Sequence, residues 1–210
     1  MLSQGIKYVF SLIHTLTEKI PVKAPFNTLI GVFVLTLIFS LSVIIIGTLI
    51  QKLKDFEFES LSNHVGTKFA SFIVYRLTFP GTIIHEFAHA TFAFITGAKV
   101  NKIQCFSLKK DTFGYVEYST RGSKIQQMMQ HSITACAPVV IGIIILPIFI
   151  SFIPSSEPIW LKILFIYLSI SMLNHMNMSS TDIKNYLKGL PVLFMVIFAI
   201  NYIMFLLIKG

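Results

Sequence analysis

Four long uncharged stretches decide the fold, and the first of them, residues 24–51, reads APFNTLIGVFVLTLIFSLSVIIIGTLIQ. The other three span 125–156, 163–181 and 189–208, and residues 77–98 contain only one charged side chain. Each stretch is long enough to cross the hydrocarbon core of a bilayer, which takes about 20 apolar residues in a helix. The sequence therefore predicts an all-α, multi-pass integral membrane protein with about five transmembrane helices.

The composition of the 210-residue chain agrees with this prediction. Hydrophobic residues make up 54% and charged residues 12% of the chain, with a mean hydropathy of +0.76, whereas a soluble domain carries about 25% charged residues. The net charge is +8, yet no dense basic stretch occurs, which excludes a nucleic-acid-binding protein. Two cysteines, Cys105 and Cys136, are too few for a disulfide framework. The partner predicted by the composition is the lipid bilayer.

The hydrophobic pattern divides the chain into two regions. Residues 1–25 form an N-terminal segment. In its first 20 residues apolar side chains recur at alternating four- and three-residue spacings, which indicates an amphipathic helix in the membrane interface. Residues 26–210 form the predicted transmembrane domain, in which 51–65 is a polar connection and 103–118 is a short β-hairpin between the second and third crossings. The predicted crossings lie near 26–50, 80–97, 126–153, 159–178 and 190–208.

The distribution of basic residues predicts the orientation of the chain. With the N-terminus inside, eleven of the seventeen Lys and Arg residues fall on the cytoplasmic side, and six of them lie in the loop 98–124. Cytoplasmic loops of membrane proteins carry such an excess of basic residues. We therefore expect a bacterial plasma-membrane protein with a cytoplasmic N-terminus.

The second predicted crossing contains the motif His85-Glu86-Phe87-Ala88-His89. Histidines four residues apart point to the same side of a helix, and Glu86 lies on that flank. Two imidazoles can then bind one Zn²⁺, while the glutamate acts as general base toward a water molecule. A glutamate inside a membrane costs about 2.5 kcal/mol or more, which favours a functional role over a polar cluster that only joins helices.

The residues alone leave the third zinc ligand open. Asp182 is the only other acidic residue at the end of a core crossing, and a carboxylate completes a site with two histidines; its alternative role is to cap a short helix over 183–187. His175 is the rival ligand. Otherwise His175 and Asn174 are predicted to donate hydrogen bonds near the metal or to contact the substrate backbone. His131 is a candidate for stabilising an oxyanion or for joining two helices.

Residues 80–100, PGTIIHEFAHATFAFITGAKV, resemble the zinc-binding helix of the site-2 protease family of intramembrane zinc metalloproteases. The small residues after the second histidine fit the pattern of that family, as does the Gly97-x-x-Val100 ending. The resemblance implies a core of three crossings over about 78–190, with the zinc motif on the first. It also implies that an aspartate on the third crossing, here Asp182, is the remaining ligand.

The resemblance implies the function as well. We expect a zinc metalloendopeptidase in which Glu86 activates water, and whose substrate is a membrane-anchored protein cleaved in or near the cytoplasmic leaflet. The alternative is a non-catalytic zinc-binding membrane protein, either a transporter or a partner-binding relic of the protease. Candidate ligands at a single depth argue against a transporter, and the retained Glu86 argues against a relic.

Overall fold

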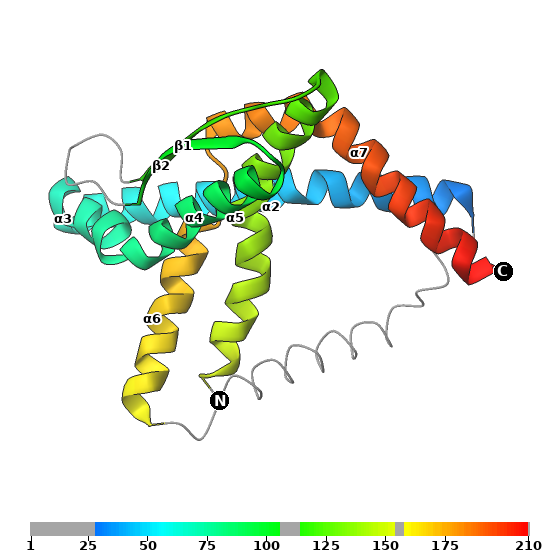
Figure 1. Cartoon of the computed structure of the whole chain (residues 1–210). Coiled ribbons are helices and arrows are strands. Elements are labelled where there is room, and N and C mark those ends of the chain that lie inside the picture. The colour runs from blue at the N-terminus through cyan, green and yellow to red at the C-terminus, as the bar shows by residue number, and fades with distance from the viewer. Residues whose placement is uncertain (1–27, 106–113, 154–157, 210) are drawn as a thin grey trace.

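A computed structural model describes residues 28–105, 114–153 and 158–209 (Figure 1). The described part of the chain is almost entirely helical and contains one two-stranded antiparallel sheet. The predicted amphipathic segment 1–25 lies outside the described residues. The all-α character and the hairpin predicted from the sequence are confirmed.

Three helices in the described residues are long and apolar enough to cross a membrane: α2 (Leu29–Val65), α5 (Lys124–Ser151) and α7 (Ser180–Lys209). The helices α4 (Phe79–Ile95) and α6 (Ile159–His175) have 17 residues each. At 1.5 Å per residue they are about 25 Å long, shorter than a hydrocarbon core of about 30 Å. The prediction of about five crossings is thus confirmed only in a coarser form, as a helical protein with three candidate membrane spans.

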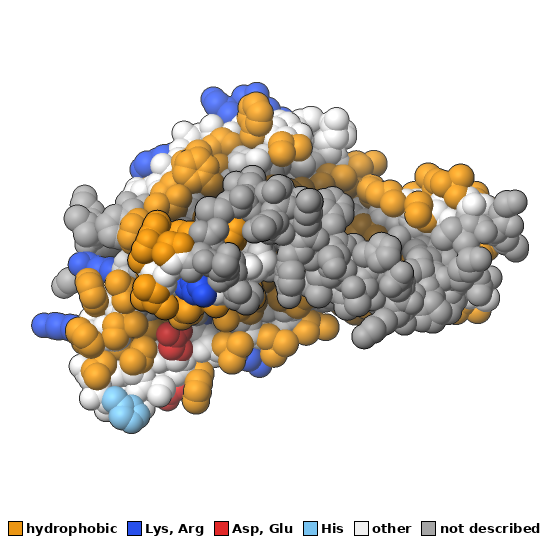
Figure 2. All heavy atoms as spheres, turned by 90° about the horizontal axis from the view of Figure 1, so that it is seen from below, with side chains coloured by type: hydrophobic (Ala, Val, Ile, Leu, Met, Phe, Trp, Pro, Cys, Tyr) orange, Lys and Arg blue, Asp and Glu red, His pale blue; other side chains and the backbone are white. Residues whose placement is uncertain are grey.

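The surface is that of a membrane protein. Large apolar side chains are exposed along most helices, including Phe94 at 75% and Leu207 at 72%. On the described part of the face seen from below in Figure 2, hydrophobic side chains outnumber charged ones. Such a continuous apolar surface is not stable in water and suits contact with lipid.

The prediction of a polar connection over 51–65 is wrong, because α2 continues through it to Val65. The physical reason is packing: Gly47, Ile50 and Lys54 all lie on the buried face of α2, so that face extends past the end of the apolar run. The helix ends at Gly66, whose φ of +83° suits glycine. A short helix α3 (Thr67–Ser71) and a π-helical turn (Phe72–Leu77) then lead to α4.

The predicted fourth and fifth crossings also have different boundaries in the structure. Helix α6 ends at His175, and residues 176–179 are not helical. Helix α7 then begins at Ser180 and runs through Pro191 as one helix of 30 residues. The short helix considered over 183–187 is therefore the first part of α7.

Helix α5 contacts α2, α4, α6 and α7, and so lies at the centre of the packing. In Figure 1, α5 and α6 extend side by side toward the bottom, whereas α2 and α7 run across the view. The strands β1 (Lys99–Gln104) and β2 (Tyr115–Ser119) pair antiparallel, with Lys99 opposite Ser119 and Gln104 opposite Tyr115, and both contact α4. The hairpin therefore covers one side of the helix that carries the zinc motif.

Tyr186 fixes the beginning of α7 against two other helices. Its side chain is buried, and its hydroxyl donates a hydrogen bond to the Ser40 carbonyl of α2 at 2.8 Å. The Tyr186 carbonyl accepts a hydrogen bond from the Ser132 hydroxyl of α5, also at 2.8 Å. Tyr186 follows Asp182 by one helical turn, so these contacts determine where Asp182 lies relative to α5.

Candidate metal centre and active site

The beginning of α4 is held tightly against α6. The Gly81 amide donates a hydrogen bond to the Ser171 hydroxyl at 2.8 Å, and that hydroxyl donates to the Thr78 carbonyl at 2.8 Å. A Cβ atom at Gly81 would lie 2.0 Å from the Ser171 carbonyl oxygen, so only glycine allows this approach. The contact places the next turn of α4, which carries His85 and Glu86, beside the end of α6.

Backbone carbonyls orient both histidines of the motif. His85 Nδ1 lies 2.5 Å from the His175 carbonyl oxygen, and His89 Nδ1 lies 2.8 Å from the Thr134 carbonyl oxygen. Because a carbonyl only accepts hydrogen bonds, each Nδ1 carries the proton and each Nε2 of the neutral ring presents a lone pair. A metal-bound histidine is held in the same way, by a hydrogen bond from its other ring nitrogen.

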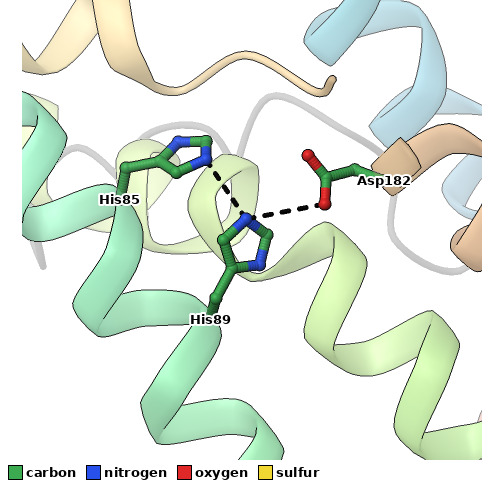
Figure 3. Close-up of side chains that lie close together, drawn as sticks. All are labelled: His85, His89 and Asp182. Atoms are coloured by element: carbon green, nitrogen blue, oxygen red, sulfur yellow. Dashed lines mark hydrogen bonds and ion pairs between the residues drawn. The ribbon is translucent and has the colours of Figure 1, made fainter. Parts of the chain in front are cut away.

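The two Nε2 atoms face each other at 3.1 Å, and Asp182 lies beside them (Figure 3). Asp182 Oδ1 is 3.6 Å from His89 Nε2, and the ligand atoms of His85, His89 and Asp182 all lie within 4.8 Å of one another. Two nitrogen lone pairs and a carboxylate oxygen at such distances repel unless a cation or a proton is shared between them. Two imidazoles with one carboxylate are a donor set that zinc takes in hydrolytic sites, so the residues present fit this metal.

The other carboxylate oxygen of Asp182 caps α7. Asp182 Oδ2 accepts hydrogen bonds from the Ser179 amide at 2.9 Å and the Ser179 hydroxyl at 2.6 Å. The Ser179 hydroxyl accepts in turn from the Asp182 amide at 3.1 Å. This reciprocal pair is a capping box. The two roles predicted as alternatives for Asp182 thus fall on different oxygens of one side chain: Oδ2 takes part in the cap, and Oδ1 faces His89.

Glu86 lines the same cavity as these three residues, and the cavity has a volume of about 470 Å³. The Glu86 side chain is buried, and residue Gly114 of the hairpin covers it. A Cβ atom at Gly114 would lie 2.8 Å from Glu86 Cγ. The hairpin therefore forms a wall of the cavity directly over the predicted general base.

Tyr118 of β2 also lines the cavity, and it connects His131 to the site. Its hydroxyl lies 3.5 Å from His131 Nδ1. Burial, and secondly the charge of Asp182, raise the pKa of Tyr118 to about 12, so its hydroxyl stays protonated and able to donate. His131 itself is not among the described cavity-lining residues. Its predicted contact with an oxyanion stays a prediction, and the structure places Tyr118 closer to the site.

Asn174 and His175 are adjacent in the sequence, but their side chains have different surroundings in the structure. The Asn174 side-chain amide donates a hydrogen bond to Glu57 Oε2 at 2.9 Å, which joins α6 to α2, and Asn174 is not among the described cavity-lining residues. His175 lines the cavity, but its carbonyl rather than its ring contacts His85. Its ring Nδ1 lies 3.0 Å from the Ser171 carbonyl oxygen. This placement favours Asp182 over His175 as third ligand, and the roles of these residues stay predictions.

Sequence reasoning missed several groups that line the cavity or orient its histidines, among them the Tyr118 hydroxyl, the Lys54 side chain and two backbone carbonyls. Lys54 of α2 was placed in a polar connection, yet it lines the cavity and is only 8% exposed. A signal for it exists, since Gly47, Ile50 and Lys54 follow one another at helical spacings on one face. The Thr134 and His175 carbonyls were missed as well, and they have no signal because every residue type has a carbonyl.

Comparison with curated proteins and with solved structures gives no match. A family model described as Peptidase M50B-like matches residues 65–209, more than half of the chain. The match begins at the last residue of α2 and includes both the histidine motif and Asp182. The predicted relationship to the site-2 proteases is confirmed, and the chain belongs to the Peptidase M50B-like family.

Proposed function

We propose that this protein is an intramembrane zinc metalloendopeptidase that hydrolyses a peptide bond of a membrane-anchored protein. One observation carries the proposal: the ligand atoms of His85, His89 and Asp182 lie within 4.8 Å of one another, in a cavity that Glu86 also lines. Membership of the Peptidase M50B-like family supports it. The exposed apolar surface supports a substrate that is met within the bilayer.

The residues of the site take different parts in the proposed reaction. His85, His89 and Asp182 hold a Zn²⁺ ion, which when bound supplies a Lewis acid for peptide hydrolysis. Glu86 takes a proton from the attacking water and delivers it to the leaving amine. The carbonyls of Thr134 and His175 keep the imidazoles in the tautomer and orientation that binding requires.

The substrate has to change conformation before it is cut. The peptide groups of a membrane helix are hydrogen-bonded to one another, so a scissile carbonyl becomes accessible only after local unwinding. The β1–β2 hairpin lies beside the cavity, and its edge suits pairing with an unwound segment, by analogy with the family.

The most direct test is zinc-dependent cleavage by the purified protein in lipid vesicles. A panel of membrane-anchored reporter proteins is added, and the products are identified by mass spectrometry. We expect bound zinc, cleavage of at least one reporter, loss of cleavage on chelation and its recovery when zinc is restored. Zinc binding without any cleavage would instead support the non-catalytic alternative.

The proposed orientation has its own test. We propose that all five predicted segments cross the membrane, that the N-terminus is in the cytoplasm of a bacterium, and that cleavage takes place in or near the cytoplasmic leaflet. This arrangement puts eleven of the seventeen Lys and Arg residues on the cytoplasmic side. With five crossings, a reporter fused near Lys110 should be cytoplasmic and one after Gly210 should be external; with only α2, α5 and α7 crossing, the Lys110 reporter would be external instead. A cytoplasmic C-terminus would contradict the arrangement.

A further inference from the structure

A buried lysine lies in the wall of the cavity, outside the region that the family model matches. Lys54 of α2 is 8% exposed and lines the cavity together with His85 and Asp182. Its Nζ atom lies 4.9 Å from the centre of the Tyr75 ring, and Tyr75 lines the cavity as well. An ionisable residue buried in a membrane-spanning helix is costly, and its presence usually marks a function.

Polar contacts join this part of α2 to the segment that leads to Asp182. Gln51, one helical turn before Lys54, accepts a hydrogen bond from the side-chain amide of Asn177. Asn177 lies between α6 and α7 and lines the cavity. The contact keeps the Lys54 turn of α2 beside the metal site, so the ammonium group belongs to the cavity rather than to the lipid-facing surface.

The acidic residues nearest to Lys54 in the sequence have other partners. Asp55 is exposed and accepts a hydrogen bond from the Gln51 side chain at 2.7 Å, and Glu57 accepts one from Asn174. Lys54 forms no ion pair with a carboxylate of the described residues. Its ammonium group lies over the face of the Tyr75 ring instead. An aromatic ring attracts a cation but does not neutralise its charge.

We propose that Lys54 binds a carboxylate group of the substrate next to the peptide bond that is cut. The inference rests on the proposed function. With zinc in place, the carboxylates of Asp182 and Glu86 balance the two charges of the ion. Lys54 is the only Lys or Arg among the described lining residues, so it leaves the cavity with a net positive charge. A buried cation that no carboxylate of the described residues contacts favours an anionic partner.

Two sources supply that carboxylate: an acidic side chain of the substrate, or the free C-terminus of a fragment left by an earlier cleavage. Both present the same two oxygens to an ammonium group, and both form a charge-assisted hydrogen bond with it. Such a bond to a charged group changes affinity by about tenfold or more.

The test measures binding rather than cleavage, in Glu86→Gln protein loaded with zinc. One probe set consists of fluorescent peptides with an apolar segment of about 20 residues, each with Glu at one position and matched by a Gln peptide. The peptides of a second set end within the apolar segment, and each carries either a free C-terminal carboxylate or a C-terminal amide. We expect at least one matched pair to differ about tenfold or more in Kd, and Lys54→Met to reduce that difference by about tenfold. The zinc charge that Glu86→Gln leaves unbalanced is the same in both proteins and does not affect this comparison.

Control variants separate the charge from the packing. Lys52→Met removes an exposed lysine of the same helix and should keep the preference, and Lys54→Arg should keep most of it. Tighter binding of the Glu peptide would identify an acidic side chain of the substrate as the group that Lys54 binds. Tighter binding of the peptide with the free carboxylate would identify the C-terminus of a fragment instead. Equal affinities within all pairs, or a preference of unchanged size in Lys54→Met, overturn the inference. Failure of the proposed function appears separately, as wild-type protein that binds no zinc or cleaves no reporter.

Discussion

The two walls of the metal site are built in different ways. Helix α4 supplies His85, Glu86 and His89 from little more than one turn, so their relative positions follow from helix geometry alone. The opposite wall is the non-helical segment 176–179 together with the first turn of α7, where Ser179 holds Asp182. A continuous helix orients its side chains locally, whereas the end of a helix depends on its cap and on packing. Substitutions of the three motif residues of α4 should therefore act on chemistry, and those at the junction of α6 and α7 on chemistry and stability together.

The largest effect is expected from His85→Ala or His89→Ala. Each removes a ligand from the rigid wall, and loss of a ligand should cost more than the roughly 10–100-fold in metal affinity seen when an outer hydrogen-bond partner is lost. We expect little or no bound zinc by elemental analysis, and no cleavage. Full zinc content in either variant would refute the site.

Glu86→Gln should separate the base from the ligands within the same wall. The general base contributes about 10²–10⁴-fold to the rate, and it does not bind the metal. We expect kcat/KM to fall by about that factor, while zinc content stays at the wild-type level. Zinc loss as large as in the histidine variants would mean that Glu86 is itself a ligand.

On the opposite wall, Asp182→Ala should lower zinc affinity by at least about tenfold, because it removes the carboxylate that faces His89. His175→Ala is the matched comparison, since it removes the ring and keeps the carbonyl that accepts from His85. We expect nearly normal zinc content in that variant by competition with a chelating dye. The reverse pattern would transfer the ligand role to His175.

Gly81→Ala tests how far α4 depends on α6. The new Cβ would lie 2.0 Å from the backbone oxygen of Ser171, which cannot rotate away, so a destabilisation of about 1–3 kcal/mol is expected. Gly47→Ala is the control, because its nearest contacts are Met178 Cγ and Sδ, which move when that side chain rotates. Thermal unfolding should show a clearly lower Tm for Gly81→Ala than for Gly47→Ala. Equal Tm values would contradict the close packing of α4 on α6.

The smallest effect is expected from Ser179→Ala, which removes the hydroxyl of the cap and leaves Asp182 in place. Loss of an N-cap costs about 0.5–2 kcal/mol of stability. Zinc affinity should fall less than in Asp182→Ala, because the carboxylate keeps its hydrogen bond from the Ser179 amide. A fall as large as in Asp182→Ala would show that the cap, rather than the ligand, determines metal binding.

Local pattern predicted much of the fold. The helical membrane character, the zinc motif on one helix and the two strands after it all depend on residues close together in the sequence. The boundaries that were wrong depend on distant contacts. Helix α2 extends past its apolar run because Ile50 and Lys54 are buried and Glu57 is hydrogen-bonded to Asn174 of α6. Helix α7 begins at Ser180 because Ser179 and Asp182 cap it.

The sequence by itself determined that His85, Glu86 and His89 share one side of a helix, because that follows from 3.6 residues per turn. The tertiary structure alone decided that Asp182 reaches His89, that Lys54 lines the same cavity, and that the carbonyls of Thr134 and His175 orient the imidazoles. These contacts join residues that are far apart in the chain and that turns and helix caps bring together. A hydrogen bond to a backbone carbonyl also leaves no trace in the sequence, because the acceptor is the same whatever side chain the residue carries.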